Sequence, residues 1–182
     1  MRWESLFADL EAQLGAGEDA ERDAEVAERT RAAWARTALA DRLRAARGHR
    51  LGLALDGGQR VSGVCSDVAV EWVSLATEAG PALVPLHAVA WVDGLGRAVA
   101  PPPGQVLRRL GLASALRALA RDRAGVRLLT AGGEVSGTID RVGADHVDVA
   151  AHPVGEVRRA GAVRSVITVP FVALRVVRGA LG

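Results

Sequence analysis

Few side chains in this sequence have the types and spacing that catalysis or metal binding requires. His146 and His152 lie near Asp145 and Asp148, but this spacing fits no recognised pattern of metal ligands, so we interpret the segment as an exposed loop. Cys65 lies in a β-type run with no neighbour in the sequence that would lower its pKa, which predicts a buried structural thiol. We therefore expect a protein that is not an enzyme and holds no metal and no cofactor.

Arginine supplies all 23 basic residues of this 182-residue chain, which has no lysine, asparagine or tyrosine. The missing residue types have codons rich in A and T, so a genome rich in G and C explains the pattern without selection for phosphate binding. Arginine alone then raises the isoelectric point to about 9.8. The distribution of charge is more informative. Residues 105–182 hold twelve arginines against six acidic residues, whereas residues 1–28 hold two arginines against nine.

Several arginines crowd the start of this basic part of the chain. Arg117 and Arg121 are spaced i, i+4 on an expected helix, where they would present charge to phosphate without reading a base sequence. Aromatic residues make up only 3% of the chain, so few side chains can supply the ~1–3 kcal/mol per base that stacking contributes. With Arg108 and Arg109, these two arginines are the candidate RNA-binding residues of the basic region.

The first residues predict an amphipathic helix. Trp3, Leu6, Phe7 and Leu10 fall at i, i+3, i+4 and i+7, which gives an apolar stripe. No glycine or proline occurs from Glu18 to Arg47, so a long helix of about 45 Å is expected there at ~1.5 Å per residue. The stripe should pack on that helix or on another chain, which makes these four residues the candidate partner-binding residues.

The chain contains an internal repeat. Three segments recur in the same order in two parts of the sequence: 57–63 as 132–137, 71–75 as 145–149, and 83–89 as 168–174. A single match of this kind can arise by chance, but three matches in register favour a duplicated domain.

Each copy has the signals of a small, strongly bent sheet behind a short helix. Leu51, Leu53 and Leu55 alternate with smaller or polar residues, as expected of a strand with one buried face. Asp56-Gly57-Gly58 reads as a hairpin turn, and Gly63 as a bend in a strand. Helices are expected at residues 40–46, ending at Gly48, and at residues 115–124, with Ser114 as N-cap and Gly125 as the end.

This order of helix, strands and turns resembles the Sm-like family, in particular its bacterial host-factor branch (Hfq). That branch has Tyr-Lys-His-Ala-Ile in the turn between its last two strands, and this chain has Pro85-Leu86-His87-Ala88-Val89. The resemblance covers residues 39–95 and 113–180. It implies ring assembly and RNA binding at the pore, with His87 as a candidate RNA-binding residue. Leu86 replaces the family lysine, and Phe171-Val172 replaces Lys-His in the second copy.

The expected fold is α+β, mainly β: two tandem Sm-like (SH3-type) small β-barrels preceded by an N-terminal helical segment. The expected domains are N-terminal helices (1–47), a first barrel (48–100), a linker with the Pro101-Pro102-Pro103 run (101–112) and a second barrel (113–182). The loop over 150–166 should differ most between the copies. Because barrels of this kind leave edge strands unpaired, we expect a homo-oligomer.

We expect a non-catalytic interaction or scaffold protein, with a protein partner bound through the N-terminal helices. The alternative is an RNA-binding protein of Sm-like type that uses the basic residues of the second copy. No apolar run reaches the roughly 18 residues that span a bilayer, so no membrane association is expected. Glu4 and Asp9 interrupt what would be the apolar region of a signal peptide, which predicts a cytoplasmic protein.

Overall fold

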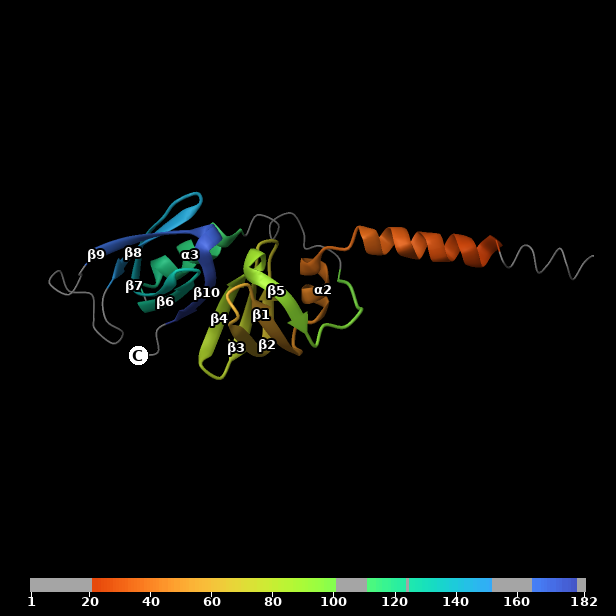
Figure 1. Ribbon diagram of the computed structural model, residues 1–182, viewed down its shortest axis with the longest axis horizontal. Helices are drawn as coiled ribbons and strands as arrows, with labels where there is room; N and C mark the ends of the chain where they lie inside the picture. Colours follow the sequence, from red (N-terminus) through yellow and green to blue (C-terminus); the bar gives the residue numbers. More distant parts are fainter. Residues whose placement is uncertain (1–20, 101–110, 124, 152–164, 180–182) are drawn as a thin grey trace, which may run out of the picture. The chain divides into compact units, whose positions relative to one another are not determined.

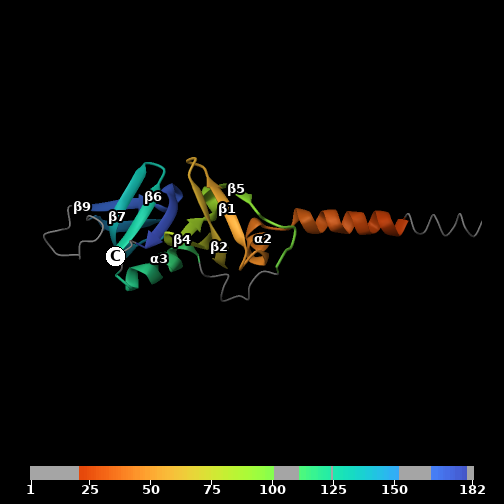
Figure 2. The ribbon, with the colours of Figure 1, turned by 90° about the horizontal axis from the view of Figure 1, so that it is seen from below.

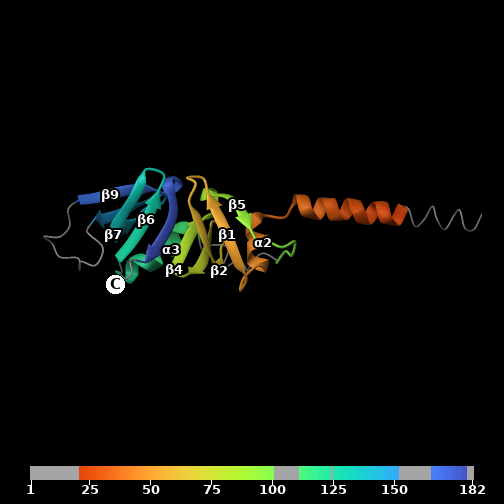
Figure 3. The same ribbon diagram turned by 60° about the horizontal axis from the view of Figure 1, so that its bottom comes forward.

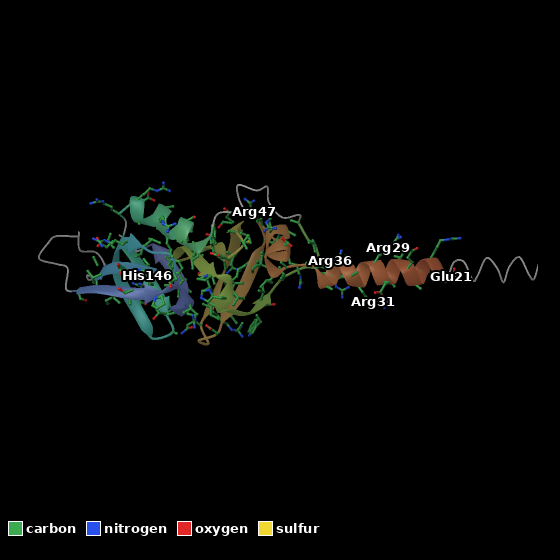
Figure 4. All side chains as sticks on the ribbon, turned by 90° about the horizontal axis from the view of Figure 1, so that it is seen from above. Glu21, Arg29, Arg31, Arg36, Arg47 and His146 are labelled. Atoms are coloured by element: carbon green, nitrogen blue, oxygen red, sulfur yellow. The ribbon has the colours of Figure 1, made fainter. Side chains whose placement is uncertain are left out.

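The structure of the chain is a computed structural model that describes residues 21–100, 111–123, 125–151 and 165–179. The chain divides into two compact units, Met1–Ala38 and Leu39–Gly182. The described part of the first unit is a helix over residues 21–35 whose side chains are exposed throughout. Ion pairs one turn apart stabilise it, from Arg29 to Glu25 (2.6 Å) and from Arg31 to Glu28 (2.7 Å). Figure 4 shows the arginines standing off this helix.

The expected continuous helix from Glu18 to Arg47 is wrong. The helix over residues 21–35 ends at residue 35, and a separate helix, α2, runs over Leu39–Ala45. The backbone N–H of Thr37 donates to the carbonyl of Trp34 (3.0 Å), and the Thr37 hydroxyl donates to the carbonyl of Ala33 (3.0 Å). These local bonds replace the next helical hydrogen bonds. The helix therefore ends here although the segment has no glycine or proline.

The described residues of the second unit form ten strands, two α-helices and two 3-10 turns. After α2 come β1 (Arg50–Leu55), β2 (Arg60–Val68), β3 (Trp72–Thr77), β4 (Gly80–Pro85), η1 (Leu86–Ala88) and β5 (Val89–Asp93). Then follow α3 (Leu112–Arg121), β6 (Gly125–Thr130), β7 (Gly133–Val142), β8 (His146–Ala151), β9 (Ser165–Pro170), η3 (Phe171–Ala173) and β10 (Leu174–Gly179). We call residues 39–100 the first half and residues 111–179 the second half.

All ten strands belong to one open antiparallel sheet, in the order β5-β1-β2-β3-β4-β10-β6-β7-β8-β9 (Figure 1). The mainly β character agrees with the expectation, but the two tandem small β-barrels are wrong. The edge strand β4 of the first half pairs with β10 of the second half, with Leu83 opposite Val177 and Ala82 opposite Arg178. The backbone N–H and C=O groups that would close a barrel within each half therefore pair with the other half instead. In Figure 3 the C-terminal strand β10 lies between β6 and β4.

The two halves repeat the same local geometry. In each half the second strand has a register shift against the third, between Cys65 and Asp67 in β2 and between Ile139 and Arg141 in β7. The 3-10 turns begin with equivalent bonds, from the Leu86 N–H to the Glu71 carbonyl and from the Phe171 N–H to the Asp145 carbonyl. Equivalent elements can therefore be compared residue by residue.

Each half has its own apolar core, and each core takes residues from the other half. Leu43 of α2 packs among buried residues of β1 to β4, and Val176 of β10 joins that cluster. Leu116 of α3 packs among buried residues of β6 to β10, with Trp72 and Leu83 of the first half against them. Figure 2 shows each helix beside the strands of its own half. The exchange of side chains makes the β4–β10 junction part of both cores.

Polar contacts also cross this junction. The Arg175 guanidinium of β10 pairs with the Asp56 carboxylate in the turn after β1, and the arginine side chain is only 12% exposed. The Glu71 carboxylate accepts a hydrogen bond from the backbone N–H of Leu112 at the start of α3 (2.6 Å). Glu71 thereby supplies a side-chain acceptor for one of the N–H groups that a helix start leaves free.

The start of α3 differs from the expectation. Gly111 is its N-cap, and Ser114 lies within the first turn. The helix ends at Arg121 and the chain turns at Arg123, which has a positive φ of 48°. Residues 101–110 of the expected linker 101–112, with the Pro101-Pro102-Pro103 run, and most of the expected long loop over 150–166 lie outside the described residues.

Substitution of the bend glycines should destabilise the fold in both halves alike. A Cβ on Gly63 would lie 2.9 Å from the Ala76 carbonyl carbon, and one on Gly137 would lie 2.9 Å from that of Ala150. We expect Gly63→Ala and Gly137→Ala each to lower the free energy of unfolding by about 1–3 kcal/mol, because the neighbouring backbone must move. Chemical denaturation measures this, and Gly96→Ala, where a Cβ meets nothing within 4 Å, is the control. Equal stability of all three variants would contradict the close packing at these bends.

Candidate functional site

A groove between α3 and β7 brings three arginines together beside the second core. Its volume is about 470 Å³. Three arginines line it, Arg117 and Arg121 from α3 and Arg141 from β7, together with Ser114, Ala120, Asp140 and Val142. We call this site the arginine groove.

The helix presents its arginines to the groove because its apolar side faces the core. Leu112 and Leu116 are buried, so Arg117 and Arg121, one turn apart, lie on the exposed side. On β7, the register shift between Ile139 and Arg141 falls where the strand passes the helix. Ile139 is buried in the core, whereas Asp140 and Arg141 are exposed.

The groove carries a net positive charge, since three arginines face one aspartate. The Arg117 guanidinium donates one hydrogen bond, to the carbonyl of Gly143 (3.1 Å). Neither Arg121 nor Arg141 has an ion pair or a hydrogen bond from its side chain within the part of the chain that the structure describes. Unpaired guanidinium groups of this kind bind phosphate or carboxylate groups well, because their N–H donors match two oxygens at once.

The structure brings together two of the residues that the sequence proposed for RNA binding. Arg117 and Arg121 both line the groove, whereas His87 lies exposed in η1 of the first half. Arg108 and Arg109, and the candidate partner-binding residues Trp3, Leu6, Phe7 and Leu10, lie outside the described residues.

Sequence reasoning missed Arg141. It stands alone in a β-type run, 20 residues from Arg121, and only the packing of α3 on β7 brings it into the groove. Alignment of the two copies at Gly63 and Gly137 would have given a signal, because Arg141 then stands where the first copy has Asp67.

The two outermost strands of the sheet, β5 and β9, form a second candidate site. Within the described parts of the chain, each pairs with one strand, β5 with β1 and β9 with β8. β9 contains no charged residue, and its Val166 and Ile167 are 58% and 37% exposed. On β5 the exposed Trp91 is covered by the guanidinium of Arg60, 4.5 Å from the ring centroid. No other described strand pairs with the outer side of β5 or β9, where backbone N–H and C=O groups can pair with a further strand.

The remaining polar candidates do not converge. Asp145 and His146 form a pair through the carboxylate and the ring nitrogen Nδ1 (2.9 Å), and Asp148 instead accepts a hydrogen bond from Thr168 (2.6 Å). Among residues 21–100, 111–123, 125–151 and 165–179, three potential metal ligands never cluster; His152 is not one of the described residues. Cys65 is buried, and burial raises the pKa of its thiol.

The helices within the described ranges are too short or too polar to cross a membrane.

The Asp145–His146 pair predicts a measurable pKa shift. The hydrogen bond from His146 holds the pKa of the Asp145 carboxyl below its ordinary value of 3.8. A carboxyl whose pKa is lowered by folding stabilises the folded state above the unfolded pKa, and this contribution is lost as the pH falls through the folded value. In an NMR titration, His146→Ala should raise the pKa of Asp145 towards the ordinary value, and His49→Ala should leave it unchanged. An Asp145 titration identical in the wild type and His146→Ala would refute the assignment.

Comparisons with known proteins give no match: no family model, no curated protein and no solved structure matches this chain. The Sm-like resemblance of residues 39–95 and 113–180 therefore stays a prediction from the sequence.

Proposed function

We propose that this chain is a non-catalytic interaction protein that assembles with further copies of itself through the free edges of its sheet. The observation that carries this proposal is the β4–β10 junction, where an edge of one half pairs with an edge of the other. The chain thus already contains one example of the contact that a second copy would make.

The strands at the free edges are the internal counterparts of the strands at the junction. β9 corresponds to β4: each has six residues, ends in Val-Pro and leads into a 3-10 turn. β5 corresponds to β10: each follows that turn and pairs with the first strand of its half, β1 or β6, with a register shift. A second copy that places its β5 against β9 therefore repeats the junction, and the assembly is head-to-tail.

The composition of β9 supports this use of the edge. Natural sheets protect free edges with charges, prolines or bulges. β9 has Pro170 only at its end, and its exposed side chains include Val166 and Ile167.

The junction and the free edges also differ in one respect. At the free edges, Ala90 stands in the place of Arg175, and Ala131 in the place of Asp56. Assembly between copies would therefore lack the ion pair of the junction.

Light scattering over a range of protein concentrations tests the proposal. The wild-type chain should show masses above that of one 18.9 kDa chain. Ile167→Lys on β9 and Ala90→Lys on β5 should each shift assembly to roughly tenfold higher concentration or more, because a charge at the edge disfavours strand pairing. Val70→Lys, at a 52% exposed valine away from both edges, should assemble like the wild type.

A mixture of the two edge variants tests the direction of pairing. Each variant keeps one intact edge, so a head-to-tail contact predicts a complex of two chains in the mixture and no larger species. Wild-type protein that stays at the mass of one chain at all micromolar concentrations would overturn the proposal. Masses unaffected by Ile167→Lys and Ala90→Lys would overturn it as well.

A further inference from the structure

We propose that the arginine groove binds phosphate groups, presented either by the backbone of a single-stranded RNA or by a free phosphate ion. The groove lies on α3 and β7, and β7 is an interior strand of the sheet, so this activity goes beyond edge-to-edge assembly. The first half provides an internal reference, because it has the same helix and strands with different charges.

The helices of the two halves align without a gap. α2 reads Leu-Ala-Asp-Arg-Leu-Arg-Ala and the start of α3 reads Leu-Ala-Ser-Ala-Leu-Arg-Ala. Leu43 and Leu116 are both fully buried, so Arg44 and Arg117, the next residues, occupy equivalent places. Ser114 then stands where the first half has Asp41.

The strands under the helices align in the same way. Gly63 and Gly137 both approach the carbonyl group of a neighbouring strand too closely for a Cβ, and the register shift follows each glycine by the same number of residues. Arg141 therefore takes the place of Asp67. The second half therefore has a neutral residue at the position of Asp41 and a positively charged residue at the position of Asp67.

The arginines on α2 and just after it have partners within the chain. Arg44 pairs with Asp41 (2.7 Å), and their side chains are only 11% and 20% exposed. Arg42 donates to the carbonyl of Gly96 (2.9 Å), in the segment that follows β5, and Arg47 donates to the carbonyl of Ser66 (3.2 Å). These contacts leave the first half with little free positive charge beside its helix.

The described residues of the second half do not provide the corresponding partners. Ser114 offers no carboxylate to Arg117, which is exposed and, among the described residues, bonds only to the Gly143 carbonyl, a neutral acceptor. Arg121 and Arg141 lie in the same groove with no partner among the described residues. The negative charge of Asp140 repels an anion, but the three positive charges of the arginines exceed it.

The groove favours phosphate without favouring a base sequence. Its apolar lining consists of Ala120 and Val142, and none of its lining residues is aromatic, so bases have no surface on which to stack. Arginine contacts to phosphate hold a strand by charge and do not read the bases. Binding should therefore depend steeply on salt and little on the sequence of the RNA.

Fluorescence anisotropy with a short, labelled single-stranded RNA of mixed sequence tests the RNA arm on the full chain. Arg121→Ala with Arg141→Ala should weaken binding roughly tenfold or more, and should reduce the slope of log affinity against log salt by about 1.4, or about 0.7 for each lost phosphate contact. Arg50→Ala with Arg97→Ala removes the same charge from exposed sites of the first half and should have a much smaller effect.

Ser114→Asp supplies a second variant that removes no arginine. It restores the acidic partner that Arg44 has in the first half, so Arg117 should pair within the helix and RNA binding should weaken. Circular dichroism should show an unchanged fold. All measurements are repeated in Ile167→Lys, so that failure of assembly and failure of phosphate binding are distinguished.

Inorganic phosphate is the probe of the second arm. If RNA does not bind, phosphate should still shift the NMR signals of α3 and β7, and should not shift them in the double variant Arg121→Ala with Arg141→Ala. This result would support the groove as a site for a free phosphate ion. Binding of neither RNA nor phosphate would overturn the proposal. Equal loss of binding in the groove and control double variants would also overturn it, because it would show a general effect of charge.

Discussion

The pairing of β4 with β10 is the constraint on which the rest of the second unit depends. It joins the middle of the chain to its end, with Leu83 opposite Val177. Val176 enters the first core while Trp72 and Leu83 pack against the second, so apolar burial in each half requires the other half. The Arg175–Asp56 and Glu71–Leu112 contacts add polar bonds across the same junction. The halves are therefore stabilised together, and neither closes on itself.

The same constraint determines which surfaces remain for function. Once β4 and β10 are joined, their counterparts β9 and β5 are left at opposite edges of the sheet. The repeat thus contains both sides of the contact that the chain makes once internally, and this is the contact that we propose between copies. The arginine groove depends on a difference between the halves: Ser114 and Arg141 stand where the first half has Asp41 and Asp67, on the same arrangement of helix and strand. The proposed assembly edges and the proposed phosphate site therefore lie on different strands, β5 and β9 against β7.

Much of the local structure could be predicted from the sequence. The period-two run at Leu51, Leu53 and Leu55, the turn after Asp56 and the bend at Gly63 are properties of short segments, and all recur in the structure. The open sheet could not be predicted in this way. The alternation of buried residues in β4 and β10 is the same whether each strand pairs within its half or across the junction, so only tertiary packing selects the partner.

The helix break and the full groove were also beyond local sequence signals. Thr37 ends the first helix through hydrogen bonds to Ala33 and Trp34 in a segment without glycine or proline. Arg117 and Arg121 were accessible to prediction because their i, i+4 spacing lies within one helix. Arg141 was not, because its place beside them depends on how α3 packs on β7.

Native-state hydrogen exchange, read amide by amide by NMR, tests the central role of the junction most directly. If the β4–β10 pairing holds both cores together, the hydrogen-bonded amides of these strands exchange only through global unfolding, with the same free energy as the most protected amides of β2 and β7. Exchange of β4 and β10 through a lower-energy opening that leaves the protection of both halves intact would contradict this account.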